Sequence, residues 1–255
     1  MTLTIAPLDD FPLVNPGDDV GVLIHESLSN NELNLKDGDI LILAQKIVSK
    51  AENRFVNLTT VKPSTRALAY AEEIGKDPRL IELILSESNQ ILRTRKNLII
   101  VEHNLGFVCA NAGIDHSNVH GPWGDPEDWV LLLPKNPDES AASIRKFLEQ
   151  RTQTRIGVLI IDSHGRAWRL GTAGTTIGLS GLPGLVDLRG KPDLFDYRLR
   201  VTMVAAADEL AAAASLVMGQ ANESTPVILA RGFPYSLREA RLEELIRPKE
   251  LDLFR

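Results

Sequence analysis

Six short apolar runs constrain the fold of this chain more than any other feature. They are four to six residues long and bounded by Gly, Asp, Asn or Pro, and they occupy residues 40–44, 98–101, 107–110, 130–133, 156–161 and 226–230. Runs of this length with such boundaries predict buried β-strands. None of them is long enough to cross a bilayer as a helix, so we expect no membrane association.

Segments with helical patterning lie between these runs. Each begins at a residue that caps helices well or stops at a glycine. The expected helices run from Ser64 to Gly75, from Asp77 to residue 85, from an N-cap at Asp138 to residue 150, and from residue 205 to Gly219. Residues 236–255 alternate charged and apolar side chains and predict a terminal helix followed by a tail.

The alternation of strands and helices predicts an α/β or mixed α+β fold. Because the regular βαβ repeat is missing, we expect a two-part fold with mixed sheets, and neither a Rossmann nor a P-loop fold. We treat residues 1–255 as one unit, with a boundary between two subdomains at 171–190 as the alternative. This glycine-rich segment is expected to contain strands and turns that approach another backbone closely.

Charge and cysteine content exclude several classes of protein. With 28 Lys and Arg against 34 Asp and Glu, the net charge is −6, which argues against a nucleic-acid-binding protein that works by neutralising phosphates. Cys109 is the only cysteine, so an internal disulfide, a CxxC redox pair and a cysteine-rich zinc site are excluded. The first residues lack the basic region and long apolar run of a secretory signal, and we expect a cytoplasmic protein.

The standard catalytic and nucleotide-binding motifs are missing. Residues 184–191 come near a phosphate-binding loop but contain one residue too many, and Pro192 stands where a hydroxyl is needed. Asp162, Ser163 and His164 are adjacent in the chain, and we do not interpret them as a hydrolase triad, which needs three separated side chains. His116 and His120 lie near Asp115, so a metal site with a histidine ligand stays open beside the default of solvated loop histidines.

Carboxylates that follow strands carry more information. Asp162 ends the run 156–161 and is followed by Ser163, and Asp115 comes soon after the run 107–110. Two carboxylates and a hydroxyl are oxygen ligands of the kind that Mg²⁺ or Mn²⁺ takes, together with water and phosphate oxygens. Helix-capping or turn roles for both aspartates are the alternative.

Two lysines follow the first apolar run. Lys46 and Lys50 come after residues 40–44 in a segment that predicts a polar turn or a helix. Lysines at the end of a strand can hold phosphate groups as point charges. The alternative is a pair of solvated lysines.

Taken together, these segments resemble the coenzyme F420-0:γ-glutamyl ligase family. The matching segments occur in the family's order and cover nearly the whole chain. They are residues 11–14 with 16–19, 38–52, 111–115 with 117–119, 161–163 with 165–169, 207–210, and 231–232. The chain ends soon after the last of them, so it resembles the stand-alone form of the family, without a fused flavin-binding domain.

The resemblance implies a GTP-dependent ligase that works as a homodimer with divalent cations, Mg²⁺ or Mn²⁺; a requirement for K⁺ stays open. It implies metal binding by Asp115, Asp162 and Ser163, and catalytic roles for Asp115, Asp162, Lys50 and Arg166. It places guanine-nucleotide contacts at Phe11, Pro12, Leu13, Val14, Gln45, Lys50, Asn118, Met218, Gly219 and Gln220. At Gln45 the family more often has Ser.

The implied reaction joins L-glutamate to the deazaflavin coenzyme precursor F420-0 through a γ-linked amide. The acceptor carboxylate attacks the γ-phosphate of GTP to form an acyl phosphate, and the amine of glutamate then displaces phosphate. Such phosphoryl transfer needs positioning and charge neutralisation more than a protein nucleophile. Arg166 and Arg169 either bind phosphate or a substrate carboxylate, or form surface ion pairs. Glu209 either coordinates a second metal or makes interactions around its own helix.

Departures from the family pattern are concentrated between Gly171 and Asp196. Residues 171–174 differ from the usual Gly-Gln-Thr, Asp196 falls where Gly is common, and Asn53 also replaces a Gly. These positions are expected to shape loops over the acceptor. A GTP-dependent ligase with a different carboxylate acceptor, or a catalytically silent nucleotide- or coenzyme-binding protein, therefore stays as an alternative, and the number of added glutamates and the acceptor variant stay open.

Overall fold

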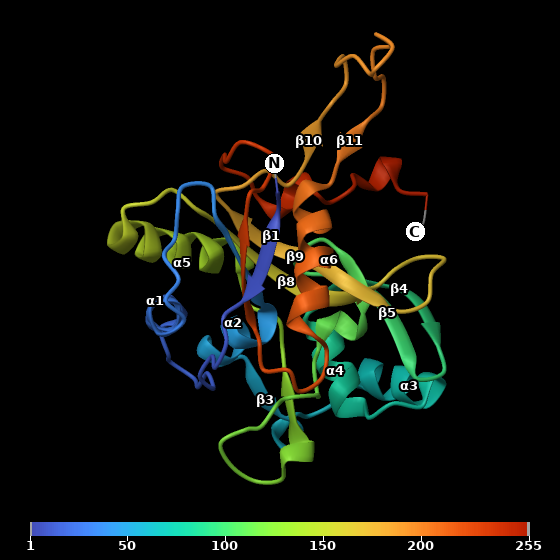
Figure 1. The fold of residues 1–255 in the computed structure, drawn as a ribbon. Helices are drawn as coiled ribbons and strands as arrows, with labels where there is room; N and C mark the ends of the chain where they lie inside the picture. Colours follow the sequence, from blue (N-terminus) through green and yellow to red (C-terminus); the bar gives the residue numbers. More distant parts are fainter. Residues whose placement is uncertain (1, 254–255) are drawn as a thin grey trace.

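A five-stranded mixed sheet forms the centre of the molecule in the computed structural model, which describes residues 2–253 (Figure 1). In spatial order its strands are β1 (Thr4–Pro7), β12 (Val227–Arg231), β2 (Ile40–Ala44), β8 (Gly157–Gly165) and β9 (Thr172–Ser180). Only β2 and β8 run parallel; the other neighbours are antiparallel. The four residues 40–43 are fully buried, as expected of a central strand that is covered on both faces.

Helices cover both faces of this sheet. On one face lie α1 (Val20–Asn30), α2 (Gln45–Ala51) and α5 (Pro137–Thr152), and on the other lies α6 (Ala206–Met218). Successive β2 side chains point to opposite faces. Leu41 and Leu43 therefore pack in the core under α1 and α5, and Ile40 and Ile42 pack in the core under α6.

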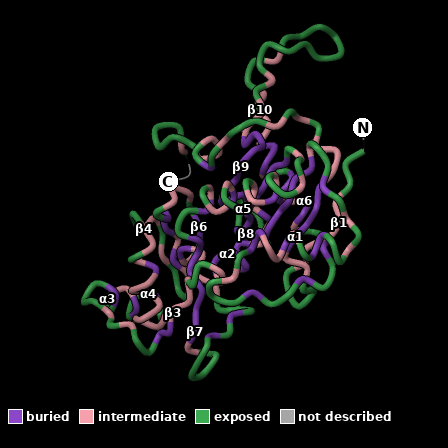
Figure 2. The backbone as a smooth tube through the Cα atoms, turned by 90° about the vertical axis from the view of Figure 1, so that its left-hand side faces the viewer, coloured by how far each residue is buried: buried purple, intermediate pink, exposed green. Residues whose placement is uncertain are grey.

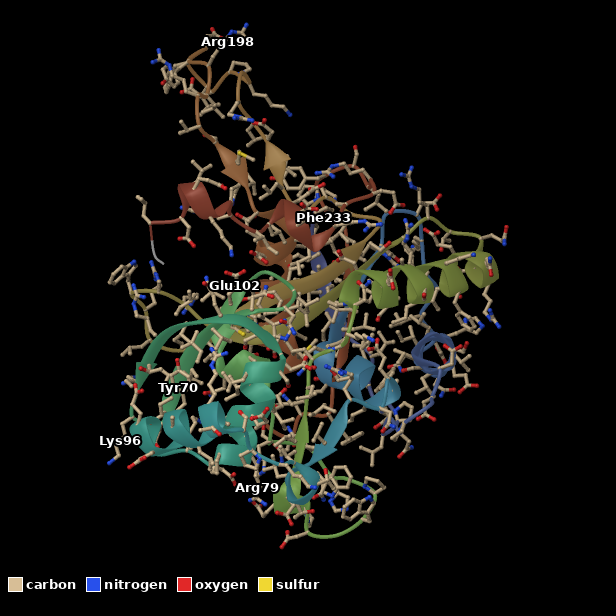
Figure 3. The ribbon with its side chains drawn as sticks, turned by 180° about the vertical axis from the view of Figure 1, so that it is seen from behind. Tyr70, Arg79, Lys96, Glu102, Arg198 and Phe233 are labelled. Carbon is tan, nitrogen blue, oxygen red and sulfur yellow. The ribbon has the colours of Figure 1, made fainter. Side chains whose placement is uncertain are left out.

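A smaller part packs beside the large sheet. Its antiparallel sheet consists of β4 (Ser88–Arg95), β5 (Leu98–His103) and β6 (Val108–Ala110), and its helices are α3 (Thr65–Ile74) and α4 (Pro78–Ser86). Tyr70, Arg79 and Lys96 mark this part in Figure 3. Their helices begin where expected, since the Ser64 hydroxyl accepts from the Ala67 amide and Asp77 accepts from the Arg79 amide. Further short elements are the β3 (Phe55–Asn57) and β7 (Trp129–Leu131) pair and the 3-10 helices η1 (Leu58–Thr60), η2 (Asn111–Gly113) and η3 (Pro126–Asp128).

A hairpin arm projects from the body between β9 and α6. Its base is the pair β10 (Val186–Asp187) and β11 (Met203–Val204), and a bridge between Pro192 and Arg198 holds its outer loop. Figures 1 and 2 show the arm standing away from both sheets, with exposed residues along most of its length. Arg198 marks its far end in Figure 3. We call residues 186–204 the arm.

The predicted fold class is confirmed: the chain has mixed α/β structure, and residues 2–253 form one mixed sheet and three antiparallel ones. All six apolar runs contain a strand, although the fourth ends at Leu131 and the fifth continues to Gly165. The glycine-rich segment contains β9, where a Cβ at Gly174 would lie 2.4 Å from the Ala211 carbonyl oxygen of α6. The close backbone approach expected there is therefore confirmed.

Two expectations about helices are wrong. The α5 N-cap is Asn136, because Pro137 takes the first helical position and the Asp138 carboxylate instead accepts from the amides of Leu179 and Leu242. Within residues 236–253 there is no α-helix, only the 3-10 helices η4 (Leu242–Glu244) and η5 (Lys249–Leu251). Pro248 interrupts this segment and lacks the amide that a continuing helix requires. Residues 254–255 of the expected tail lie outside the described residues.

Within residues 2–253, no helix combines the length and apolarity that crossing a bilayer requires.

Candidate active site

The site is organised by the only parallel pair of strands in the large sheet. Ala44 at the end of β2 lies opposite Ile161 on β8, so the next residues, Gln45 and Asp162, emerge side by side at one edge of the sheet. Between Ile160 and Ile161 the register with β9 shifts by one residue, and such bulges re-aim the side chains near them. β2 leads directly into α2, so polar side chains from both strands reach the same space.

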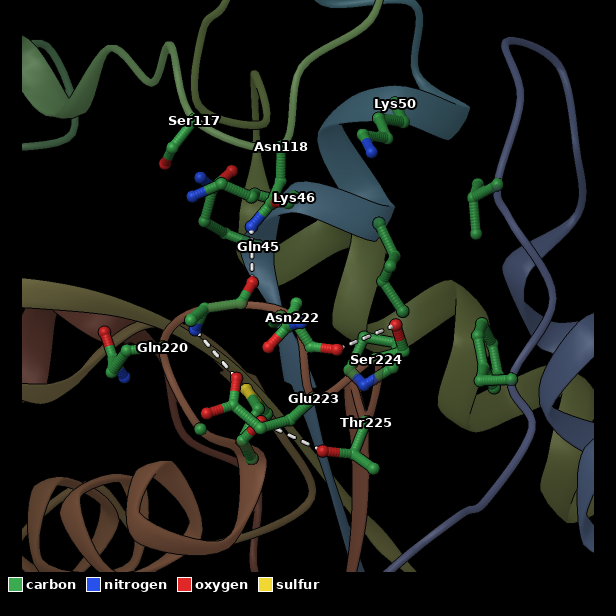
Figure 4. Close-up of a pocket in the computed structure, with 18 of the residues that line it drawn as sticks. Gln45, Lys46, Lys50, Ser117, Asn118, Gln220, Asn222, Glu223, Ser224 and Thr225 are labelled. Atoms are coloured by element: carbon green, nitrogen blue, oxygen red, sulfur yellow. Dashed lines mark hydrogen bonds between the residues drawn. The ribbon is translucent and has the colours of Figure 1, made fainter.

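A cavity of about 490 Å³ opens at this edge. Its walls come from the loop before α1, from α2, from the segment after η2, from the end of β8 and from the loop after α6 (Figure 4). Twelve of its lining residues are ones that the sequence predicted: Phe11, Pro12, Leu13, Val14, Gln45, Lys50, Asn118, Asp162, Ser163, Met218, Gly219 and Gln220. Segments far apart in the chain thus meet around one cavity.

Asp115 is fixed through both its backbone and its side chain. Its amide and carbonyl exchange hydrogen bonds of 2.9 Å with Leu131. Its Oδ2 accepts from Gln45 Nε2 at 2.5 Å and lies 2.5 Å from Lys46 Nζ. Asp115 is not itself among the lining residues, but Gln45 and Lys46 are, so the structure places it directly behind the wall of the cavity.

The electrostatics indicate that the two aspartates are neighbours. Burial raises the pKa of Asp115, Lys46 opposes this effect, and the negative charge of Asp162 raises this pKa further. Burial also works to raise the pKa of Asp162, but contact with His164, the Ser163 amide and the charge of Lys46 outweigh it, and the pKa lies below its ordinary value. Lys46 therefore compensates the charge of both carboxylates.

Lys46 and Lys50 place two positive charges on the same wall. They lie four residues apart on α2 and therefore share one face of the helix, and both line the cavity. Burial, followed by repulsion from Lys46, lowers the pKa of Lys50. Such a pair attracts a polyanion, because an anion between them relieves their repulsion.

The opposite wall is the loop of residues 219–226. Ser163 Oγ donates to Gln220 Oε1 at 2.8 Å. Asn118 Nδ2 donates to the Ala221 carbonyl at 3.0 Å (Figure 4). Gly219 ends α6 with φ of 75°, and a Cβ there would lie 2.2 Å from Glu223 Cδ. Only glycine allows the chain to turn here, which brings the loop across the end of β8.

Arg166 is the predicted site residue that the structure leaves apart from the cavity. It lies in the exposed turn after β8, where its guanidinium donates to the Leu170 carbonyl at 3.3 Å, and it does not line the cavity. Its catalytic role stays a prediction. Lys46 also lines the cavity. The sequence analysis named it with Lys50 as a possible phosphate ligand, but the family resemblance assigned a role to Lys50 alone.

The donors at this edge fit a hard divalent cation. They are oxygen atoms: two carboxylates, the Ser163 hydroxyl and the Gln220 amide oxygen. Among residues 2–253, no group of three or more His, Cys, Asp or Glu side chains is placed to hold a metal ion. A cation here would therefore complete its shell with water and phosphate oxygens, as Mg²⁺ does in nucleotide sites.

Known proteins are similar to this chain over its whole length. The family model described as F420-0:Gamma-glutamyl ligase matches residues 10–232. A protein of Methanothermobacter thermautotrophicus named Coenzyme F420:L-glutamate ligase is 45% identical over 257 residues, covering 100% of both chains. Proteins of the same name are 43% identical in Methanopyrus kandleri, covering 100% of this chain and 98% of that protein, and 36% identical in Archaeoglobus fulgidus, covering 100% and 97%. The matched region includes every wall of the cavity.

Proposed function

The chain belongs to the F420-0:gamma-glutamyl ligase family, and we propose that it joins L-glutamate to the deazaflavin coenzyme precursor F420-0 through a γ-linked amide, at the expense of GTP and with a divalent cation. The observation that carries the proposal is the cavity at the parallel ends of β2 and β8. There the lysine pair of α2 faces the end of β8, where Asp162 and Ser163 lie. Relatives that match over the whole length are named Coenzyme F420:L-glutamate ligase, which supports the glutamate-adding part of the proposal.

In the proposed first step, the acceptor carboxylate attacks the γ-phosphorus of GTP. A carboxyl oxygen–phosphorus bond forms, the bond to the bridging oxygen breaks, and GDP leaves. Lys46 and Lys50 offset the negative charge of the phosphates, and the loop of residues 219–226 with Asn118 holds the nucleotide. Asp115, Asp162 and Ser163 would hold a divalent cation, which would supply charge neutralisation for the phosphates.

In the second step, the amine of L-glutamate attacks the acyl carbon. A carbon–nitrogen bond forms, the carbon–oxygen bond to phosphate breaks, and the amine loses a proton. The step needs a nucleophile that is held next to the acyl phosphate and protected from water. Phe11 and Val14 are buried beside the cavity and give it an apolar wall, which limits the access of water to the cavity.

We also propose that the chain works as a homodimer whose arms bind the partner. Leu194, Phe195 and Val201 of the arm are 97%, 89% and 85% exposed. Burying such side chains contributes about 1.5–3 kcal/mol each, and the arm stands too far from its own body to bury them (Figure 1). A second copy of the chain would cover the arm.

Mass spectrometry of the product tests the proposed reaction. Purified protein is incubated with F420-0, GTP, L-glutamate and Mn²⁺ or Mg²⁺, with and without K⁺, and we expect a product heavier by one or more glutamyl residues and an equal release of phosphate. Asp162→Asn should abolish both. Phosphate release without added glutamate would mean a different acceptor, and GTP binding without turnover that Asp162→Asn leaves unchanged would mean a silent nucleotide-binding protein.

A further inference from the structure

His164 lies against Asp162 although the sequence motif offered no role for it. The two residues are two positions apart on β8 and therefore point to the same face of the sheet. His164 Nε2 lies 3.0 Å from Asp162 Oδ2, and the imidazole is 8% exposed. The approach is not aligned for a linear hydrogen bond, and within residues 2–253 His164 Nε2 has no other polar partner. A buried polar atom without an aligned hydrogen bond costs free energy, so its presence beside Asp162 calls for a functional explanation.

An aromatic stack holds the His164 imidazole in place. Phe107 lies between two histidine rings: its centroid is 5.2 Å from that of His164, at an interplanar angle of 49°, and 5.2 Å from that of His103, at 8°. Phe107 packs against the cores on both faces of the large sheet and against the core of the smaller part. Phe107, which lies where the two parts of the fold meet, therefore restricts the position of the His164 imidazole.

The Asp162 carboxylate needs such a partner if it is to bind a cation. The terminal torsion of an aspartate is broad and roughly two-fold, so an isolated carboxylate has no single orientation. A neighbour at Oδ2 that cannot itself move fixes this torsion and thereby fixes the direction of the other oxygen. Partners of this kind around metal ligands typically change metal affinity by about 10–100-fold.

We propose that His164 is a positioning residue that orients the Asp162 carboxylate toward a divalent cation in the cavity. The inference rests on the proposed function for the presence of that cation. His164 does not contact the substrate or the cation itself; it acts through Asp162, and the stack with Phe107 and His103 keeps it there. The stack also makes the smaller part of the fold contribute to a site that the large sheet builds.

Binding of Mn²⁺ to the full-length protein, measured by electron paramagnetic resonance of the free ion with GDP present, tests the proposal without relying on turnover. His164→Leu keeps an apolar side chain in the stack but removes the ring nitrogen, and we expect Mn²⁺ binding to weaken by roughly 10–100-fold. His164→Gln returns a donor near the Nε2 position and should restore binding to within about threefold of the wild type. A purely structural role would not produce this rescue.

Ile84→Val is the matched control for loss of packing. Ile84 is fully buried in the core of the smaller part, so its truncation lowers thermal stability without changing Mn²⁺ binding. Equal Mn²⁺ binding by His164→Leu and the wild type, with Asp162→Asn losing it, would overturn the inference and leave the proposed site intact. Absence of Mn²⁺ binding by the wild type would instead remove the cation from the proposed function, and the inference with it.

Discussion

Gln45 Nε2 donates to Asp115 Oδ2 at 2.5 Å, and Gln45 is 1% exposed. Its own amide oxygen accepts from Ser49 Oγ at 2.8 Å, one turn further along α2. Lys46 Nζ reaches the same Asp115 oxygen. The same carboxylate oxygen thus receives both donors, and α2 itself holds Asp115 in position. Gln45, expected to contact the nucleotide, therefore has a second role that its position in the sequence did not reveal.

Gln45→Leu should lower kcat/KM for GTP-dependent glutamate addition by roughly 10–100-fold, because the carboxylate loses a buried donor that fixes its orientation. Phosphate release with F420-0 and glutamate present measures this. Gln150→Leu makes the same change at an exposed position of α5 and should have no effect. Wild-type activity in Gln45→Leu would mean that Lys46 alone positions Asp115.

Local patterns in the sequence were sufficient to predict six of the strands and the helices α3 to α6, whereas α1 and β4 were not predicted. Strand-sized apolar runs, the Ser64 cap and the Gly75 stop depend on a few neighbouring residues, and the structure agrees with them. The prediction of Asp138 as an N-cap was wrong because the amides of Leu179 and Leu242, from distant segments, donate hydrogen bonds to its carboxylate. Hydrogen bonds from distant residues compete with helix capping for the same carboxylate, and a local sequence pattern does not reveal them.

The candidate site likewise combines features that neighbouring residues determine with features that depend on tertiary contacts. Asp162 and Ser163 were found because they directly follow an apolar run, and the loops that line the cavity were found because they resemble a family. The roles of Gln45 and His164 depend on which side chain lies opposite Asp115 or Asp162. These neighbours are set by the parallel register of β2 with β8 and by the packing of Phe107 between two sheets. Neither arrangement follows from the order of residues in the sequence.

Cys109 should be inert in the folded protein. Burial, followed by the charge of Asp162, raises the pKa of its thiol to about 12, so the reactive thiolate is almost absent near neutral pH. Intact-mass measurement after iodoacetamide treatment at about pH 8 should show labelling only once guanidinium chloride unfolds the chain. A Cys109→Ala variant that carries Ser86→Cys, at an exposed position, is the control and should label readily without denaturant. Rapid labelling of the native wild type would contradict the buried position.

Leu194→Ser combined with Phe195→Ser should convert the proposed dimer into a monomer. The two residues lie in the outer loop of the arm, between the bridged Pro192 and Arg198, and expose apolar surface that a second copy would cover. Light scattering coupled to size-exclusion chromatography measures the mass of the wild type and the variant. Leu251→Ser, at an exposed apolar residue near the C-terminus, controls for a general loss of surface hydrophobicity. A variant that keeps the mass of a dimer would place the interface elsewhere.

His103 should make the folded state sensitive to acid. Burial, followed by the positive charges of His164 and Arg54, lowers the pKa of His103 to about 4, against about 6.5 in an unfolded chain. Glu87 faces the ring too, with Oε2 3.8 Å from Nε2, but it is paired with Arg54 at 2.8 Å. The Nδ1 atom accepts from the Leu105 amide, so the neutral ring is the form that the fold holds.

Between these two pKa values the unfolded state binds the additional proton, and the free energy of unfolding therefore falls as the pH falls, by about 3 kcal/mol over the whole interval. His103→Asn, which retains an acceptor near Nδ1, should remove this part of the pH dependence in urea unfolding, whereas His25→Asn on α1 should leave it unchanged. If the wild type and His103→Asn lose stability in parallel as the pH is lowered, another group carries the acid sensitivity.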